Sequence, residues 1–204
     1  GGRLFHVDPI DATVGGIVCN SGTAMRRLGL RVAASSLVGG DLWGEVVRSR
    51  LAAEEIDTSA VETHASLATS TTAVLIDPSG ERSFAHHVGA PAAITLGFVR
   101  GQLARFARAR VAMLGYCGLL PGLEPELAAA TAAIRAAGCL VAVETAGSGG
   151  TLATIAPALP QIDLYVPSLD EATHQTGLVD PHGIVDCYRS HGAAGIVGVK
   201  LGSR

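Results

Sequence analysis

The feature that most restricts the fold is a regular alternation of strand-like and helix-like segments in the second half of the chain. Short apolar and β-branched runs take turns with helical patterns that carry one apolar side. The strand-like runs are 111–114, 140–143, 164–166 and 196–201, and the helical patterns are 98–107, 125–137, 152–158, 169–176 and 183–190. Short links between such segments predict an α/β fold with a mainly parallel sheet and helices on both faces. Ligands then bind beyond the carboxyl ends of the strands.

The first half of the chain predicts two helix-and-strand segments and then a hairpin. The expected elements are a helix over 20–28, a strand over 31–38, a helix over 41–55 and strands over 71–76 and 81–86. Asn20 or Ser21 is the expected N-cap of the first helix. Asp77-Pro78-Ser79-Gly80 is a strong turn sequence between the two hairpin strands. Residues 3–14 read as one broken strand, which we expect to join the hairpin in a small separate sheet.

Composition excludes several classes of function. Hydrophobic residues make up 48% of the 204 residues and charged residues 16%, which indicates an ordered core. The net charge of −3 argues against a nucleic-acid partner. The four cysteines form no Cys-x-x-Cys pair and the histidines do not cluster, so zinc and redox motifs are unsupported. No apolar run is long enough to cross a membrane, so we expect no membrane partner and a cytoplasmic protein.

The paired glycines Gly15 and Gly16 and the following Asn20 form the first candidate binding segment. Glycines let a ligand approach the backbone closely, because no Cβ intrudes. The start of a helix also offers N–H groups that have no partner within the helix. The segment therefore suits a hydroxyl-rich or anionic small molecule. An ordinary connection between a strand and a helix is the alternative interpretation.

Two segments of the first half resemble signatures of the ribokinase-like (PfkB) carbohydrate kinases. Gly15-Gly16, three residues, Asn20 and a small-residue helix ending in Leu28-Gly29 resemble the sugar-binding signature of that family. The segment 38–44, Val-Gly-Gly-Asp-Leu-Trp-Gly, resembles its Gly-x-Asp-x-x-Gly segment. The resemblance implies that Gly15, Gly16 and Asn20 bind the sugar.

The same resemblance implies a division of the chain into a lid and a core. Residues 1–19 and 69–90 correspond to a small β lid, and residues 20–68 and 91–204 correspond to the α/β core of one kinase domain. In that family the lid covers the sugar and keeps water away from the transferred phosphoryl group. Lid sheets of this kind often pair in homodimers, so a homodimer through the lid is implied for the full-length protein.

Two later segments resemble the nucleotide side of these kinases. Residues 162–177 are similar to the family pattern in which an Asp at a strand is followed by Pro-Asn-x-x-Glu, and the Glu holds the water shell of Mg²⁺. Glu171 matches that Glu, and Ser168 stands in place of the Asn. A capped helix, with Ser168 as N-cap, explains the same residue types equally well. The chain end, Val197 to Gly202, resembles the strand end at which the nucleotide site begins, which implies that Lys200 and Gly202 lie near ATP.

The catalytic element of the family, Gly-Ala-Gly-Asp, does not occur in the sequence. Its Asp is the base that acts on the sugar hydroxyl, and its glycine N–H groups stabilise the transition state. No catalytic residue is therefore assigned in this chain, and the base is expected beyond Arg204. The resemblance implies an internal piece of a kinase, truncated at both ends and inactive by itself.

The resulting hypothesis is ATP-dependent phosphoryl transfer to a hydroxymethyl group of a small-molecule sugar, of the fructokinase or ribokinase type. ATP and Mg²⁺ are the implied cofactors, with Mg²⁺ held by Glu171 through water. Two alternatives remain open. One is a nucleoside kinase of the adenosine type with the same fold, and the other is a non-catalytic α/β module that binds a small molecule.

Overall fold

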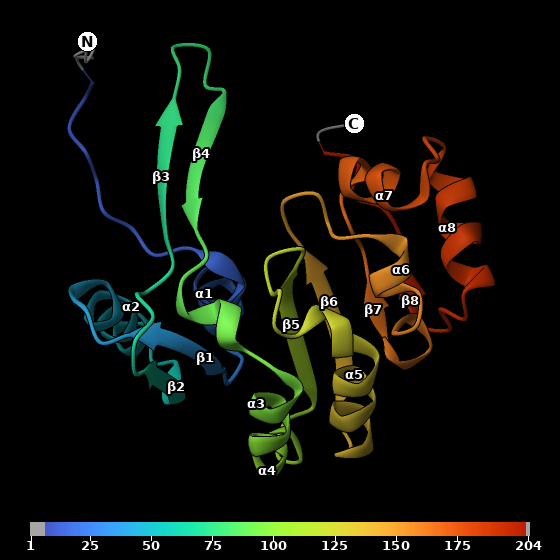
Figure 1. Ribbon diagram of the computed structural model, residues 1–204, viewed down its shortest axis with the longest axis horizontal. Coiled ribbons are helices and arrows are strands. Elements are labelled where there is room, and N and C mark those ends of the chain that lie inside the picture. The colour runs from blue at the N-terminus through green and yellow to red at the C-terminus, as the bar shows by residue number, and fades with distance from the viewer. Residues whose placement is uncertain (1–6, 203–204) are drawn as a thin grey trace.

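The computed structural model describes residues 7–202. The parallel strands fall into two sheets, which Figure 1 shows side by side. One sheet pairs β1 (Ala33–Gly39) with β2 (Asp57–His64). The other contains, in this order, β5 (Val111–Cys117), β6 (Leu140–Thr145), β7 (Leu164–Tyr165) and β8 (Ile196–Val197). The alternation in the sequence therefore predicts the parallel strands correctly, but the described strands form two sheets rather than one.

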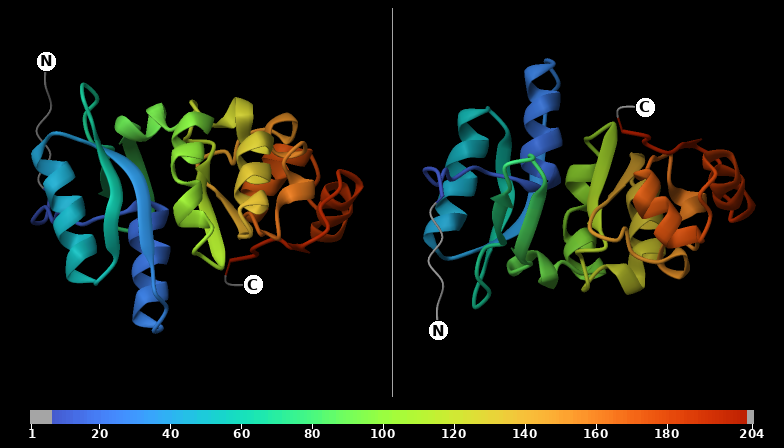
Figure 2. Two further views of the ribbon diagram at one scale, coloured as in Figure 1. Left: turned by 90° about the horizontal axis from the view of Figure 1, so that it is seen from below. Right: turned by 90° about the horizontal axis from the view of Figure 1, so that it is seen from above.

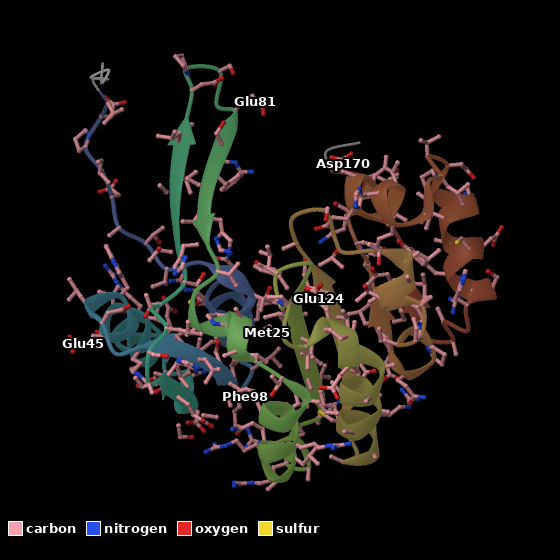
Figure 3. All side chains as sticks on the ribbon, viewed as in Figure 1. Met25, Glu45, Glu81, Phe98, Glu124 and Asp170 are labelled. Atoms are coloured by element: carbon pink, nitrogen blue, oxygen red, sulfur yellow. The ribbon has the colours of Figure 1, made fainter. Side chains whose placement is uncertain are left out.

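The predicted hairpin is present and forms a sheet of its own. Strands β3 (Thr71–Ile76) and β4 (Arg82–His87) pair antiparallel. The Asp77 carboxylate closes the turn by accepting hydrogen bonds from the N–H groups of Ser79 and Glu81, at 2.8 and 3.0 Å. Figures 1 and 3 show the hairpin standing away from the rest of the molecule, with Glu81 near its far end.

The strand expected over residues 3–14 is wrong for the part that the structure describes. Residues 1–6 lie outside the described range, and residues 7–15 form no strand. Pro9 lies in the middle of this segment and has no N–H group to donate to a sheet. Most of the segment is exposed, including Ile10 at 89%. Among the described residues the hairpin therefore has two strands only.

Helices cover both sides of the sheets, and Figure 2 shows α1 and α5 on opposite sides. The helices are α1 (Gly16–Arg27), α2 (Leu42–Ala53), α3 (Leu96–Gly101), α4 (Leu103–Phe106), α5 (Leu127–Ala136), α6 (Leu152–Ile155), α7 (Leu169–Thr176) and α8 (Pro181–Ser190), with short 3₁₀ turns at Ala90–Ala93, Glu124–Glu126 and Leu159–Gln161. The helix expected over 98–107 is interrupted at Gln102, between α3 and α4. None of the described helices is long and apolar enough to span a bilayer.

The core has two parts, one for each parallel sheet. The larger part lies between the β5–β8 sheet and its helices and includes Ile134, Val141 and Leu159, none of which is accessible to solvent. The smaller part packs β1 and β2 against α1 and α2, around residues such as Leu51 and Val61. Each sheet therefore has its own apolar support.

A large cleft of about 3510 Å³ is lined by residues of both parallel sheets, of α1 and of the hairpin. Within residues 7–202, β1 forms strand pairs only with β2, and β5 only with β6. The edges of β1 and β5 both line the cleft. The carboxyl ends of β5 and β6 open into it as well, through Tyr116 and Glu144. The cleft therefore borders the carboxyl ends of these strands.

Replacing Ile134 by alanine tests the larger core. Ile134 lies in α5 and is 0% exposed, so Ile134→Ala is expected to lower the free energy of unfolding by about 2 to 5 kcal/mol. Leu140→Ala, at a position 53% exposed, is the control and is expected to change it by only about 0.5 kcal/mol. Urea unfolding followed by circular dichroism measures both. Equal midpoints for the two variants would contradict this account of the core.

Candidate functional site

The N-terminus of α1 presents an open stretch of backbone. The helix begins at Gly16, with Gly15 as an N-cap that provides no side-chain hydrogen bond. Gly16 has a φ of +78°, and a Cβ added at Gly15 or Gly16 would have no atom within 4 Å. The first N–H groups of the helix therefore lack a side-chain cap. This arrangement leaves room for a ligand to accept hydrogen bonds from the helix start.

Asn20 does not cap the helix, and that prediction is wrong. The helix starts four residues earlier, at Gly16, so Asn20 lies one turn inside it. Helical side chains lean toward the N-terminus, so the exposed Asn20 amide extends back toward the turn of Gly16. Asn20 therefore lies about one helical turn from the paired glycines.

Asp41 is committed to a structural role. Its Oδ1 accepts hydrogen bonds from the Gly44 N–H at 2.9 Å, which caps α2, and from the Thr69 hydroxyl at 2.6 Å. Its Oδ2 accepts from the Thr69 N–H at 2.8 Å. A Cβ at Gly39 would lie 2.6 Å from the Thr69 nitrogen, so only glycine allows this close approach. Asp41 therefore fastens the residues that lead into β3 onto the end of β1.

Tyr116 joins α1 to the four-stranded sheet. Leu114 pairs with Val143 and Cys117 pairs with Thr145, so a β-bulge lies between them and reorients Tyr116. Burial raises the pKa of the Tyr116 phenol, and the nearby Asn20 side chain opposes this rise. The sequence marks Tyr116 only as the end of a strand. Its proximity to Asn20 places this strand end beside α1.

Glu144 and Lys200 form an ion pair at the strand ends. The Lys200 Nζ lies 2.7 Å from the Glu144 Oε1. The Lys200 backbone is fixed as well, because its N–H donates to the Pro167 carbonyl at 2.8 Å and its carbonyl accepts from the Leu169 N–H at 3.0 Å. These bonds place Lys200 beside the start of α7.

Ser168 and Glu171 form a complete capping box at the start of α7. The Glu171 Oε2 accepts hydrogen bonds from the Ser168 N–H and hydroxyl, both at 2.8 Å, and the Ser168 Oγ accepts from the Glu171 N–H at 3.3 Å. The capped-helix interpretation is therefore confirmed. The capping box uses only one of the two Glu171 carboxylate oxygens. Within the described part of the chain, the other oxygen, Oε1, has no hydrogen-bond partner.

The glycine-rich loop 147–150 packs against α7 next to Glu171. A Cβ at Gly149 would lie 2.9 Å from the Glu171 Cβ. The buried Gln175 holds the loop by donating from Nε2 to the Gly149 carbonyl at 2.6 Å, while its Oε1 accepts from the hydroxyls of Tyr165 and Tyr188. The sequence analysis did not predict this supporting role, although a run of glycines directly after a strand end is a signal for it.

The predicted binding residues lie in two groups along one open cleft, at the start of α1 and at the start of α7. Gly15, Gly16, Ser168, Glu171 and Lys200 line it, and Asn20 lies near Tyr116, which also lines it. Gly202, with a φ of +68°, is exposed and lies outside the cleft lining. Thr145 also lines the cleft, and its buried Oγ1 has no hydrogen-bond partner among residues 7–202.

The described residues contain no cluster of three or more His, Cys, Asp or Glu side chains that could hold a metal ion. Cys19, Cys117, Cys139 and Cys187 are all free thiols. Burial raises the pKa of Cys117 to about 12, so this thiol stays protonated and unreactive at neutral pH.

Comparison with solved structures shows that the chain has the ribokinase-like α/β fold. A PfkB protein from Polaromonas sp. JS666 superimposes with a TM-score of 0.82 at 24% identity, over 99% of this chain and 71% of that chain. A protein from E. coli described as ribokinase II, in a complex with ATP and Mg²⁺, superimposes with a TM-score of 0.71 at 17% identity, over 94% of this chain and 66% of that chain. The fold class predicted from the sequence is confirmed.

The chain belongs to the pfkB family of carbohydrate kinases, because the sequence profile of that family matches residues 3–204. A fructokinase from Salmonella typhimurium is 31% identical over 169 residues, which make up 81% of this chain and 51% of the fructokinase. The chain thus spans about half the length of this curated relative.

Asp41 is expected to make stability depend on pH. Hydrogen bonds from Thr69 and Gly44 lower the pKa of Asp41, so its ionised form stabilises the fold above the unfolded-state pKa of about 3.9. This contribution disappears as the pH falls through the lower pKa of the folded state. Asp41→Asn is therefore expected to be less stable than the original chain at pH 7, with a difference that shrinks below about pH 4.

Urea unfolding at a series of pH values measures this difference. Asp170→Asn is the control, because Asp170 is an exposed carboxylate on α7 (Figure 3) that does not contact Thr69. A constant difference between Asp41→Asn and the original chain from pH 7 to pH 3 would contradict the assigned hydrogen bonds.

Proposed function

We propose that the chain contributes the acceptor site and part of the nucleotide site of an ATP-dependent sugar kinase of the fructokinase or ribokinase type. The observation that carries the proposal is the shared cleft: the open start of α1 and the Glu171–Lys200 side both line it, in a chain of the pfkB family. The transferred group would be the γ-phosphoryl of ATP, and the acceptor a hydroxymethyl group of the sugar.

The acceptor side of this proposal rests on α1. Uncapped N–H groups at Gly15 and Gly16 donate hydrogen bonds, and the Asn20 amide both donates and accepts. A sugar hydroxyl also both donates and accepts, so the two surfaces are complementary. The absence of Cβ atoms at the glycines allows the sugar ring to lie against the backbone.

The nucleotide side rests on Glu171 and Lys200. Mg²⁺ keeps several of its waters and is held by few carboxylates, so one free carboxylate oxygen suits it. The Glu171 Oε1 fits this requirement, because capping uses only Oε2. When bound, Mg²⁺ supplies charge neutralisation at the phosphates. Ser168 keeps the carboxylate oriented, and Lys200 and Gly202 are the proposed contacts to the nucleotide.

The catalytic base is proposed to lie outside the residues described here. The nearest sequence to Gly-Ala-Gly-Asp is Gly39-Gly40-Asp41, and both carboxylate oxygens of Asp41 accept hydrogen bonds from Gly44 and Thr69. An Asp whose two carboxylate oxygens already accept hydrogen bonds, and whose pKa is lowered, is a poor base. We therefore propose that the chain binds both substrates but does not catalyse transfer by itself.

The lid, the dimer and the cellular location complete the proposal. Residues 69–90 are proposed as the lid, because β3 and β4 contribute side chains to the cleft lining. The lid bounds predicted over residues 1–19 need correction, because residues 16–19 lie in α1 and residues 7–15 form no strand. Closure over the cleft would exclude water from the reacting groups. The hairpin exposes Val74, Leu75, Ile76 and Phe84, an apolar surface that suits pairing with a second lid in a homodimer. Four free thiols suit a reducing compartment such as the cytoplasm.

Asn20→Ala tests the acceptor site. Loss of the amide is expected to weaken sugar binding by about two- to tenfold, the range of one neutral hydrogen bond. Calorimetry with a panel of ketoses, aldoses and nucleosides measures this affinity, and Ser21→Ala serves as the neighbouring control.

Preference for a nucleoside would favour the nucleoside kinase. Sugar binding without any binding of Mg-ATP would favour the non-catalytic module, and release of ADP by this chain would overturn the placement of the base.

Glu171→Gln and Ser168→Ala separate the Mg²⁺ role from the capping role. Glutamine keeps an oxygen that accepts from Ser168, so Glu171→Gln is expected to preserve stability but weaken Mg²⁺-dependent ATP binding by about tenfold or more. Ser168→Ala removes a cap and is expected to cost about 1 kcal/mol of stability, with a smaller effect on Mg-ATP. Unchanged Mg-ATP affinity in Glu171→Gln would contradict the Mg²⁺ role and show that Glu171 only caps α7.

A further inference from the structure

The strand-end region of the cleft carries a charge arrangement that does not favour a polyphosphate. We define this region as the cleft-lining residues at or just beyond the carboxyl ends of the strands, namely Tyr116, Glu144, Thr145, Ser168, Glu171 and Lys200. Two of these residues are carboxylates, and only Lys200 is a cation. Lys200 is also the only lysine in the sequence. Lys200 therefore carries the only ammonium group that can bind a phosphate in this region.

That ammonium group is already paired with a carboxylate. The Lys200 Nζ lies 2.7 Å from the Glu144 Oε1, and the two side chains are 46% and 30% exposed. The two residues are 56 positions apart in the sequence. Glu144 lies in β6, and Lys200 lies just beyond β8, where it forms a β-bridge with Ser168. At this exposure the pair is worth little to the stability of the fold. Since it is both weak and accessible from the cleft, a stronger anion can replace Glu144.

We propose that Glu144 holds the Lys200 ammonium group in a resting ion pair, and that a nucleotide phosphate replaces the Glu144 carboxylate when it binds. This inference rests on the proposed function, which places the phosphates of ATP beside Lys200. Lys200 keeps its backbone position during the exchange, because its N–H donates to the Pro167 carbonyl and its carbonyl accepts from the Leu169 N–H. Only the side chain changes partner. Glu144 thereby sets the affinity of the cleft for anions.

The exchange makes Glu144 a competitor of the phosphate rather than a supporting contact. Removing its charge should leave Lys200 unpaired and strengthen anion binding. A supporting role would give the opposite result, because an unrestrained lysine side chain loses more conformational freedom on binding. The sign of the change in affinity therefore separates the two roles.

Glu144→Gln is expected to bind Mg-ATP and inorganic tripolyphosphate about threefold more tightly than the original chain, the order of one partly exposed ion pair. Lys200→Gln is expected to weaken both, and adding Glu144→Gln to Lys200→Gln is expected to give no further gain. Glu54→Gln is the matched control, because Glu54 is 28% exposed, pairs with Arg27 and lies outside the cleft. Isothermal calorimetry at constant ionic strength measures all variants.

The single lysine provides a second readout that does not depend on turnover. Reductive methylation with ¹³C-formaldehyde labels Lys200 and the N-terminal amine while keeping their charge, and Lys200→Gln identifies the lysine signal. The Lys200 signal is expected to move when tripolyphosphate is added to the original chain. In Glu144→Gln it is expected to differ from that of the original chain before any ligand is present.

Unchanged or weaker anion binding in Glu144→Gln would overturn the inference, even where Lys200→Gln weakens binding and so supports the proposed nucleotide site. If the original chain and Glu54→Gln bind neither probe, the proposed nucleotide site and this inference both fail. A gain that persists in the Lys200→Gln background would also contradict the exchange, because it would show general repulsion by Glu144 instead of competition for Lys200.

Discussion

Parallel hydrogen bonding in the β5–β8 sheet determines where the candidate nucleotide-binding residues lie. Because the strands run in one direction, their carboxyl ends meet at one edge, and Tyr116, Glu144, Ser168 and Lys200 follow those ends. These residues are far apart in the sequence. The apolar core beneath the sheet keeps the strands in register, so the geometry of the site depends on packing that contains no ligand-binding residue.

The sequence predicted correctly those turns and helix ends that are stabilised by residues close to them in the chain. The turn Asp77–Gly80 closes through its own Asp side chain, and the start of α7 closes through Ser168 and Glu171 three residues apart. Gly177 ends α7 in the left-handed conformation that glycine permits, at a φ of +72°. In each case the interacting groups lie within one turn of chain, and the residue types alone carry the information.

Features with distant causes were not predictable in this way. The start of α1 at Gly16 overrides the capping preference of Asn20, and α1 packs against both β1 and β5. The proximity of Asn20 to Tyr116 and the pairing of Glu144 with Lys200 involve segments that no periodicity relates. The resemblance to a kinase family identified Gly15, Gly16 and Lys200 as residues of interest. The structure shows that these residues line one cleft.

The hydrogen bonds between Asp41 and Thr69 fix the base of the hairpin, and this base is the fulcrum of any rotation of the hairpin. The base of β3 is fastened to the N-terminus of α2 and the end of β1, while six residues on each strand extend beyond it. Strands of that length reach about 20 Å, so a rotation of about 10° at the fulcrum displaces the tip by about 3.5 Å. A small rotation between β1 and α2 is therefore expected to be amplified at the tip of the hairpin. The hairpin would then act as a lever arm, anchored at its base by Asp41 and by the hydrogen bond from the Ala90 N–H to the Ala68 carbonyl.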